Sequence, residues 1–136
     1  MPLDENRLFK PVNIALLTVS DTRSLDNDTS GDILSERIVA AGHKLADRAI
    51  LRDDTALITA QLQSWIDDDH IDVVISTGGT GLTGRDVTPE ALNRVKTKDI
   101  PGFGELFRWL SFDKIGTSTI QSRATDGVTE GTYLFA

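Results

Sequence analysis

The chain has 136 residues, of which 39% are hydrophobic and 26% charged, the composition of one soluble domain large enough to bury a core. It has no cysteine and only two histidines, so disulfide bonds, thiolate catalysis and cysteine-based zinc sites are excluded and a multi-histidine metal site is disfavoured. Its net charge of −7 at pH 7 argues against nucleic acid and anionic membranes as partners.

No apolar run approaches the roughly 18 residues that a membrane span needs. The N-terminal residues Met1–Arg7 include acidic side chains and lack the apolar centre of a signal peptide, so the expected location is cytoplasmic. His43 and His70 stand at polar element boundaries, and both are expected on the surface.

The first half of the chain alternates between apolar runs and amphipathic segments. Val12–Val19 is a short apolar run rich in β-branched residues, which predicts a buried strand. A helix follows the polar loop after this strand; Thr29 or Ser30 is expected to cap it, and Gly42 to end it. Leu45–Leu51 is predicted as the second strand.

A second helix is expected to open at Asp53-Asp54-Thr55, and spacing alone lets either aspartate cap it. Its apolar stripe, which is expected to face the core, consists of Ile58, Leu62, Trp65 and Ile66. The acidic Asp67–Asp69 run ends the helix as a solvated turn. Ile71–Ser76 is the third predicted strand.

The second half of the chain begins with a glycine-rich loop. Thr88-Pro89-Glu90 then combines a capping hydroxyl, a first-turn proline and an acid, which together predict a helix start. Pro101–Glu105 breaks the chain, a helix is expected over about Phe103–Phe112, and Thr132–Ala136 is the last predicted strand.

Strands that alternate with helices predict an α/β protein with three α/β/α layers and a mainly parallel central sheet. In such sheets, ligands bind outside the carboxyl ends of the strands. Asp21, Asp53 and the Thr77–Asp86 loop each follow a predicted strand, so they are expected to meet in one crevice. Ser20 and Asp21 could bind substrate there or form a polar turn.

The loop Ser76–Asp86 reads STGGTGLTGRD and contains the spacing G-x-G-x-x-G. The dinucleotide interpretation is disfavoured, because that motif must open a helix and here the helix begins only at Thr88. A Walker loop is excluded, since its lysine is absent. Two interpretations remain open, a phosphate-binding loop and a structural turn. Asp86 belongs beside a phosphate only if a cation such as Mg²⁺ lies between them.

Three motifs in this half of the chain resemble a known family. TGGTGLTGRDVTPEA at residues 77–91 is followed by PGFGE at 101–105 and SRA at 122–124. Together they resemble the MoaB/MogA family of molybdenum-cofactor biosynthesis proteins, and the wider stretches are closer to its MoaB members. The resemblance runs from Val12 to the end of the chain and implies one molybdopterin-binding domain over residues 1–136. The family continues past the strand that matches YLFA with a loop and a helix, which are expected to be lacking here.

Active members of that family transfer AMP from Mg·ATP to the terminal phosphate of molybdopterin and release pyrophosphate. The resemblance implies that Asp53 and Asp86 are the catalytic, magnesium-binding aspartates. It implies that Ser122 and Arg123 line the site, and it leaves Glu105 without a role. The residues implied to hold the pterin phosphate are Thr77, Gly78, Gly79, Thr80 and Gly81.

This chemistry suits a chain without cysteine, because the attacking phosphate oxygen is already ionised at pH 7 and transfer depends on positioning and charge neutralisation. Arg85 and Arg123 are expected to offset negative charge. The alternative is a non-catalytic molybdopterin-binding or scaffold protein of the same fold. Such a protein would share the phosphate loop and differ in the role of its carboxylates.

The helix Phe103–Phe112 is apolar on two sides. One side carries Phe103 and Leu106, and Trp109 and Phe112 project from nearly the opposite side. In so small a domain this pattern favours a subunit contact over a central core helix. The resemblance implies a homotrimer or a homohexamer, with Trp109 and Phe112 at the contact.

Overall fold

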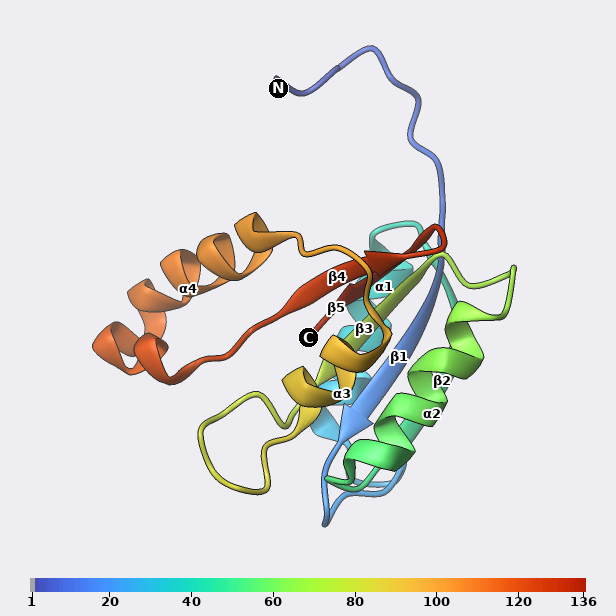
Figure 1. Ribbon diagram of the computed structural model, residues 1–136. Helices are drawn as coiled ribbons and strands as arrows, with labels where there is room; N and C mark the ends of the chain where they lie inside the picture. Colours follow the sequence, from blue (N-terminus) through green and yellow to red (C-terminus); the bar gives the residue numbers. More distant parts are fainter. Residues whose placement is uncertain (1) are drawn as a thin grey trace.

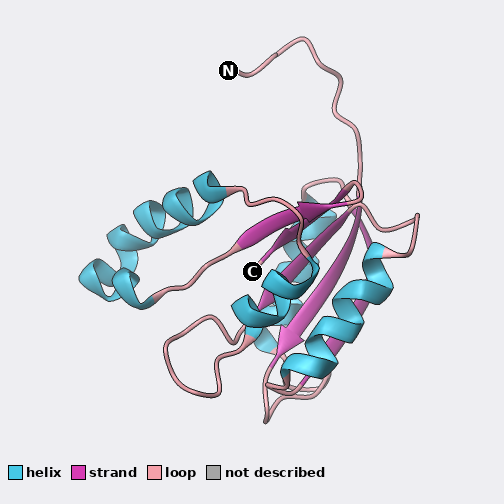
Figure 2. Cartoon of the chain, viewed as in Figure 1, coloured by secondary structure: helices cyan, strands magenta, loops and turns pink. Residues whose placement is uncertain are grey.

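The computed structural model describes residues 2–136 and has three layers, with a sheet between helices (Figures 1 and 2). The sheet has five strands in the order β2-β1-β3-β5-β4. The strands are β1 (Asn13–Val19), β2 (Lys44–Leu51), β3 (Val73–Thr77), β4 (Asp126–Thr129) and β5 (Thr132–Phe135). The helices are α1 (Thr29–Ala40), α2 (Thr55–Ile66), α3 (Thr88–Val95), α4 (Pro101–Ile115) and the 3₁₀ helix η1 (Gly116–Gln121).

The predicted mainly parallel sheet is confirmed. β1 pairs in parallel with both β2 and β3, and β3 pairs in parallel with β5, whereas β4 is antiparallel to β5. The chain moves from β1 outward to β2 and then returns to the other side of β1 to form β3. The strand order therefore reverses between β1 and β3, which is where open α/β sheets bind their ligands.

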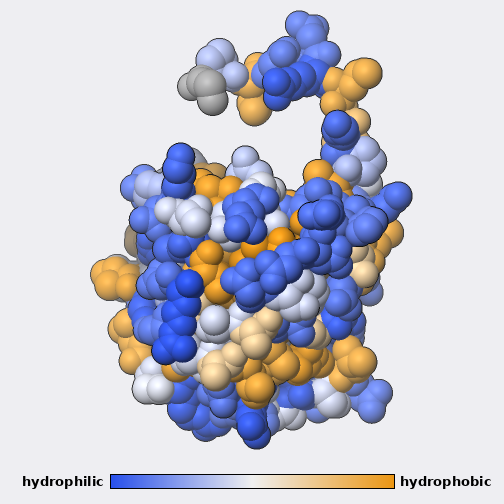
Figure 3. Space-filling model, turned by 45° about the vertical axis from the view of Figure 1, so that its right-hand side comes forward, coloured by the Kyte–Doolittle hydropathy of each residue, from blue (hydrophilic) through white to orange (hydrophobic). Residues whose placement is uncertain are grey.

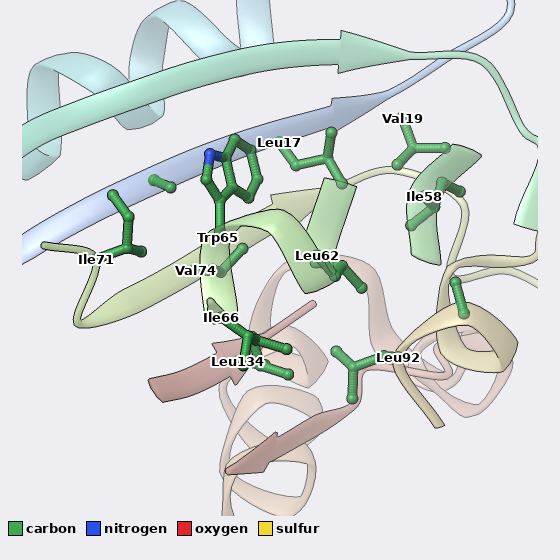
Figure 4. Packing of buried hydrophobic residues seen from close by; sticks show 12 residues of the cluster. Leu17, Val19, Ile58, Leu62, Trp65, Ile66, Ile71, Val74, Leu92 and Leu134 are labelled. Carbon is green, nitrogen blue, oxygen red and sulfur yellow. The ribbon is translucent and has the colours of Figure 1, made fainter. Parts of the chain in front are cut away.

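The main core lies between the sheet and the helices α2 and α3. The predicted α2 stripe is buried there, and the indole of Trp65, 2% exposed, packs among the aliphatic side chains shown in Figure 4. Its Nε1–H donates to Oδ2 of Asp47 at 2.9 Å, so the polar atom of the ring is satisfied. α1 covers the opposite face of the sheet (Figure 1).

β4 was not predicted, because its four residues DGVT contain no apolar run. It forms because it pairs with β5 across a two-residue turn, Glu130-Gly131, in which both residues have positive φ. Such a turn matches the twist of a hairpin. The predicted bounds of α4 were too narrow, since the helix includes Pro101 at its first turn and continues to Ile115.

The expected cap of α1 was wrong. Asp28 caps the helix, because its carboxylate accepts the N–H of Gly31 at 3.0 Å. This carboxylate is fully buried and also accepts hydrogen bonds from Thr18 at 2.7 Å and Arg48 at 3.0 Å. Burial raises the pKa of Asp28, but the hydrogen bonds from Thr18 and Arg48 outweigh it and leave the pKa below its ordinary value. Asp28 therefore ties α1 to β1 and β2.

The N-terminal arm, residues 2–11, projects from the body of the molecule (Figures 1 and 3), and apolar patches interrupt the polar surface on the face shown in Figure 3. His43, which was expected on the surface, is partly buried: its Nδ1 accepts the N–H of Val12 at 3.1 Å and its ring lies against Phe9. His70 is exposed as expected. Within residues 2–136, no helix is both long enough and apolar enough to cross a membrane.

Candidate functional site

The candidate site lies where β1, β2 and β3 end. Ser20-Asp21 follows β1, Asp53 follows β2, and the glycine loop, residues 78–87, follows β3. Parallel pairing brings these three carboxyl ends to one edge of the sheet (Figure 1). The convergence arises from topology, because β2 and β3 flank β1 on its two sides.

Thr88 holds the first half of the glycine loop. Its Oγ1 donates to the carbonyl of Gly78 at 2.9 Å, and its N–H donates to the carbonyl of Gly79 at 3.1 Å. The expectation that the Thr88 hydroxyl caps α3 was therefore wrong, since α3 has no side-chain cap and Val87 occupies that position. The hydroxyl serves the loop instead, and Thr88 is 1% exposed.

Arg123 holds the second half of the loop. Its backbone N–H donates to the carbonyl of Thr80 at 2.8 Å, and its Nε–H donates to the carbonyl of Gly81 at 2.7 Å. Nη2 donates to the carbonyl of Asp86 at 2.6 Å, and the guanidinium also pairs with Glu90. The guanidinium of Arg123 is thus engaged by acceptors of the protein itself.

The N–H groups of the same segment are free. Within residues 2–136, no hydrogen bond uses the N–H of Gly78, Gly79 or Thr80. Their carbonyls all accept hydrogen bonds from Thr88 or Arg123. Adjacent unpaired N–H groups in a loop with positive φ form a concave anion-binding surface.

Two glycines are required for this shape. Gly78 has φ +94°, and a β-carbon there would lie 2.2 Å from the carbonyl oxygen of Val19. Gly79 has φ +71°, and its β-carbon would lie 2.3 Å from Oγ1 of Thr88 and 3.3 Å from Oδ1 of Asp53. Any side chain at these positions would face both backbone strain and a clash.

The two aspartates that open α2 have different roles. Asp54 caps the helix, because its Oδ1 accepts the N–H of Leu57 at 3.0 Å. Asp53 is not needed as a cap, and its carboxylate lies beside Gly79. Asp21 positions it, since Oδ1 of Asp21 accepts the backbone N–H of Asp53 at 2.9 Å.

Asp86 belongs to the loop itself, near its C-terminal end. Its Oδ2 accepts the N–H of Thr83 at 2.9 Å and the Thr83 hydroxyl at 2.7 Å, and a β-carbon on Gly81 would lie 2.7 Å from it. The hydrogen bonds from Thr83 lower the pKa of Asp86 below its ordinary value. Burial and the negative charge of Asp86 raise the pKa of Asp53. The two carboxylates therefore flank the same loop and interact electrostatically.

The carboxylates of Asp53 and Asp86 suit a Mg²⁺ ion whose remaining ligands would be substrate oxygens. Within residues 2–136, no group of three His, Cys, Asp or Glu side chains could hold a metal ion by itself. Mg²⁺ commonly binds through one or two carboxylates together with substrate phosphates. Burial and, secondly, repulsion from Asp86 raise the pKa of Asp53, and a cation between the two carboxylates would relieve the repulsion.

The remaining predicted site residues already have contacts within the protein. Oγ of Ser20 accepts the N–H of Thr22 at 3.3 Å, and Oγ of Ser122 accepts the N–H of Ala124 at 3.2 Å. Arg85 forms an ion pair with Asp21.

Glu105 is exposed on α4, where it lines a small polar cavity together with Lys96 and Arg108. The contacts of Thr88 with the loop and of Glu90 with Arg123 were not predicted, because both residues already had a local explanation at the start of α3.

An apolar cavity of about 470 Å³ adjoins the glycine loop. Thr77, Gly78 and Thr80 line one part of it. Side chains from α1, β3, α4 and β5 line the rest, among them Leu34, Ile75, Phe103, Phe107 and Phe135. The glycine loop therefore lies beside the carboxylates of Asp53 and Asp86 and also beside this apolar cavity.

Fold and site together define a three-layer α/β domain with a glycine loop of free N–H groups at a reversal of strand order. A family model described as a probable molybdopterin binding domain matches residues 15–135. Molybdenum cofactor biosynthesis protein B of Escherichia coli K12 is 49% identical over 128 residues, which cover 94% of this chain and 75% of that protein. The Staphylococcus aureus (strain COL) protein of the same name is 42% identical and is covered over 79% of its length.

A crystal structure of molybdenum cofactor biosynthesis protein B superimposes with a TM-score of 0.90 at 40% identity, over 95% of this chain and 81% of that one. The chain therefore belongs to the MoaB/MogA family of molybdenum-cofactor biosynthesis proteins.

Proposed function

We propose that the chain binds the terminal phosphate of molybdopterin in its glycine loop and transfers AMP to it from ATP. The observation that carries this proposal is the loop itself. Its N–H groups at Gly78, Gly79 and Thr80 are free while its carbonyls are held by other residues, and two carboxylates flank it. The adjoining apolar cavity is consistent with an organic group beside the phosphate.

In the proposed reaction, a phosphate oxygen of molybdopterin forms a bond to the α-phosphorus of ATP. The bond from that phosphorus to the bridging oxygen of the β-phosphate breaks, and pyrophosphate leaves. The N–H groups of the loop hold the attacking phosphate in place, so the step depends mainly on positioning.

Asp53 and Asp86 are the residues that would hold Mg²⁺, which supplies charge neutralisation to the phosphate groups when it is bound. Such a role requires both carboxylates to be ionised. Asp86 is ionised at neutral pH, since the hydrogen bonds from Thr83 lower its pKa.

A binding protein without catalysis is the second candidate, and the contacts of Asp86 favour it. Both donors of Thr83 engage Oδ2 of Asp86, so this carboxylate already serves to shape its own loop. In that case the phosphate site is retained, and Asp86 has no role beyond the conformation of residues 83–86.

The substitution Asp86→Asn tests the proposal. Asparagine keeps an acceptor for the Thr83 N–H, so the loop is expected to persist while the charge is lost. Pyrophosphate release from Mg·ATP and molybdopterin is expected to fall by more than about 100-fold, and molybdopterin binding is expected to stay near wild type. Retained release in the variant would remove Asp86 from the metal role, and no release by the wild type would support the binding protein.

We also propose that α4 forms a contact between copies of this chain, in a trimer or hexamer. Gly104 is the only buried residue among those of α4, while Trp109 is 71% exposed and Phe112 53% exposed. Covering such apolar surface gains about 25 cal/mol per Å². Sedimentation velocity at micromolar concentration is expected to give a trimer or hexamer that Trp109→Glu dissociates. A monomeric wild type would contradict the contact.

A further inference from the structure

All three guanidinium nitrogens of Arg123 contact acceptors within the protein. Nε donates to the carbonyl of Gly81 at 2.7 Å, Nη2 to that of Asp86 at 2.6 Å, and Nη1 pairs with Glu90. An arginine has a rigid planar fork of donors, so its orientation is set once three of its nitrogens are engaged.

Glu90 sets this orientation. It lies in the first turn of α3, whose neighbouring residues Ala91 and Leu92 are buried, so its backbone is anchored in the core. Its carboxylate contacts both Nη1 and Nη2 of Arg123. The hydrogen bond from Arg123 lowers the pKa of Glu90, so Glu90 is a carboxylate at neutral pH.

The carbonyl contacts also determine where the N–H groups point. The C=O and N–H of one peptide unit point in opposite directions, because the unit is planar and trans. Arg123 holds the carbonyl of Thr80 through its backbone and that of Gly81 through its side chain. These two peptide units carry the N–H groups of Gly81 and Leu82, which are therefore turned away from Arg123. Arg123 thus fixes the backbone that directly follows Thr80.

We propose that Glu90 and Arg123 form a clamp of positioning residues, that this clamp fixes residues 80–86 and so supports the adjoining free N–H groups of Gly78, Gly79 and Thr80, and that neither residue contacts the ligand. The ligand role for this loop rests on the proposed function. The clamp itself is a statement about loop conformation, so the two can be tested separately.

The direction in which anion binding changes when Glu90 loses its charge distinguishes the clamp from direct attraction between Arg123 and the phosphate. Glu90→Gln removes a negative charge near the loop. If Arg123 attracted the ligand phosphate directly, this change would leave anion binding unchanged or strengthen it. If Glu90 orients Arg123, the same change weakens binding, by about tenfold as for other residues that orient a ligand group.

The experiment compares wild type, Glu90→Gln and the control Glu36→Gln. Glu36 is exposed on α1 and undergoes the same chemical change. Amide ¹⁵N–¹H spectra report the loop through Gly79, Gly81 and Gly84, and molybdopterin affinity is measured by fluorescence titration. The clamp predicts shifted glycine resonances and about tenfold weaker binding in Glu90→Gln only, with unchanged far-UV circular dichroism.

A second variant, Arg123→Lys, retains the charge but cannot reach both carbonyls from one ammonium group. It is expected to reproduce the glycine shifts of Glu90→Gln, and the double variant is expected to add little further change. Unshifted glycine resonances, or binding by Glu90→Gln that equals or exceeds the wild type, would overturn the clamp. If the wild type binds no molybdopterin, the proposed function fails and the spectra alone decide on the clamp.

Discussion

Replacing Asp53 with asparagine is expected to lower the rate of adenylyl transfer by more than about 100-fold, while Asp54→Asn leaves it near wild type. Asp53 lies beside Gly79 and has no role as a cap, whereas Asp54 caps α2 through the N–H of Leu57. Asparagine is an equally good cap but a much poorer ligand for Mg²⁺ than a carboxylate.

The measurement is pyrophosphate release under saturating molybdopterin and Mg·ATP. Asp53→Asn and Asp54→Asn each remove one negative charge, at adjacent positions. Asp54→Asn therefore controls for the general electrostatic effect of losing a charge at the start of α2. An equal loss of rate in both variants would contradict a specific role for the Asp53 carboxylate.

The same Asp53 variant is expected to be more stable than the wild type at pH 7. Burial and the charge of Asp86 raise the pKa of Asp53 above its ordinary value of 3.8. A carboxyl group with a raised folded-state pKa favours folding while protonated, and this contribution is lost as pH rises through the folded pKa.

Urea unfolding at pH 7 should therefore show a higher free energy of unfolding for Asp53→Asn. The gain should shrink below about pH 4, where the wild-type carboxyl is protonated in both states. A gain that is the same at both pH values would show that the charge of Asp53 is not its cause.

Gly78→Ala is expected to destabilise the protein by about 2–3 kcal/mol and to abolish the phosphate-binding shape of the loop. Gly78 has φ +94°, and a β-carbon there would lie 2.2 Å from the backbone carbonyl oxygen of Val19, the last residue of β1. A backbone atom inside a sheet cannot move aside as a flexible side chain can, so the loop itself must shift.

Gly84→Ala is the matched control, because a β-carbon there meets no heavy atom within 4 Å. Thermal unfolding compares the stabilities, and fluorescence titration compares molybdopterin binding. Equal stabilities for the two variants would contradict the close packing of Gly78 against β1.

The order of the main elements was predictable from sequence because they depend on local patterns. The apolar run of β1 and the apolar stripe of α2 predict that these residues are buried, and both predictions were confirmed. β4 was missed because its stability comes from pairing with β5 rather than from its own residues. The cap of α1 was expected at Thr29 or Ser30, one or two residues after the actual cap Asp28, because the hydrogen bonds of Asp28 to Thr18 and Arg48 depend on distant parts of the chain.

The family, the alternation of strands and helices, and the glycine loop between β3 and α3 could all be inferred from the order of residues. The role of each polar side chain could not, because it depends on the three-dimensional packing. Thr88 holds the loop rather than capping α3, and Arg123 reaches carbonyls 37 and 42 residues away. The physical reason is that hydrogen bonds are short and directional, so their partners are chosen by the positions that strand pairing and helix packing impose, which local spacing along the chain does not encode.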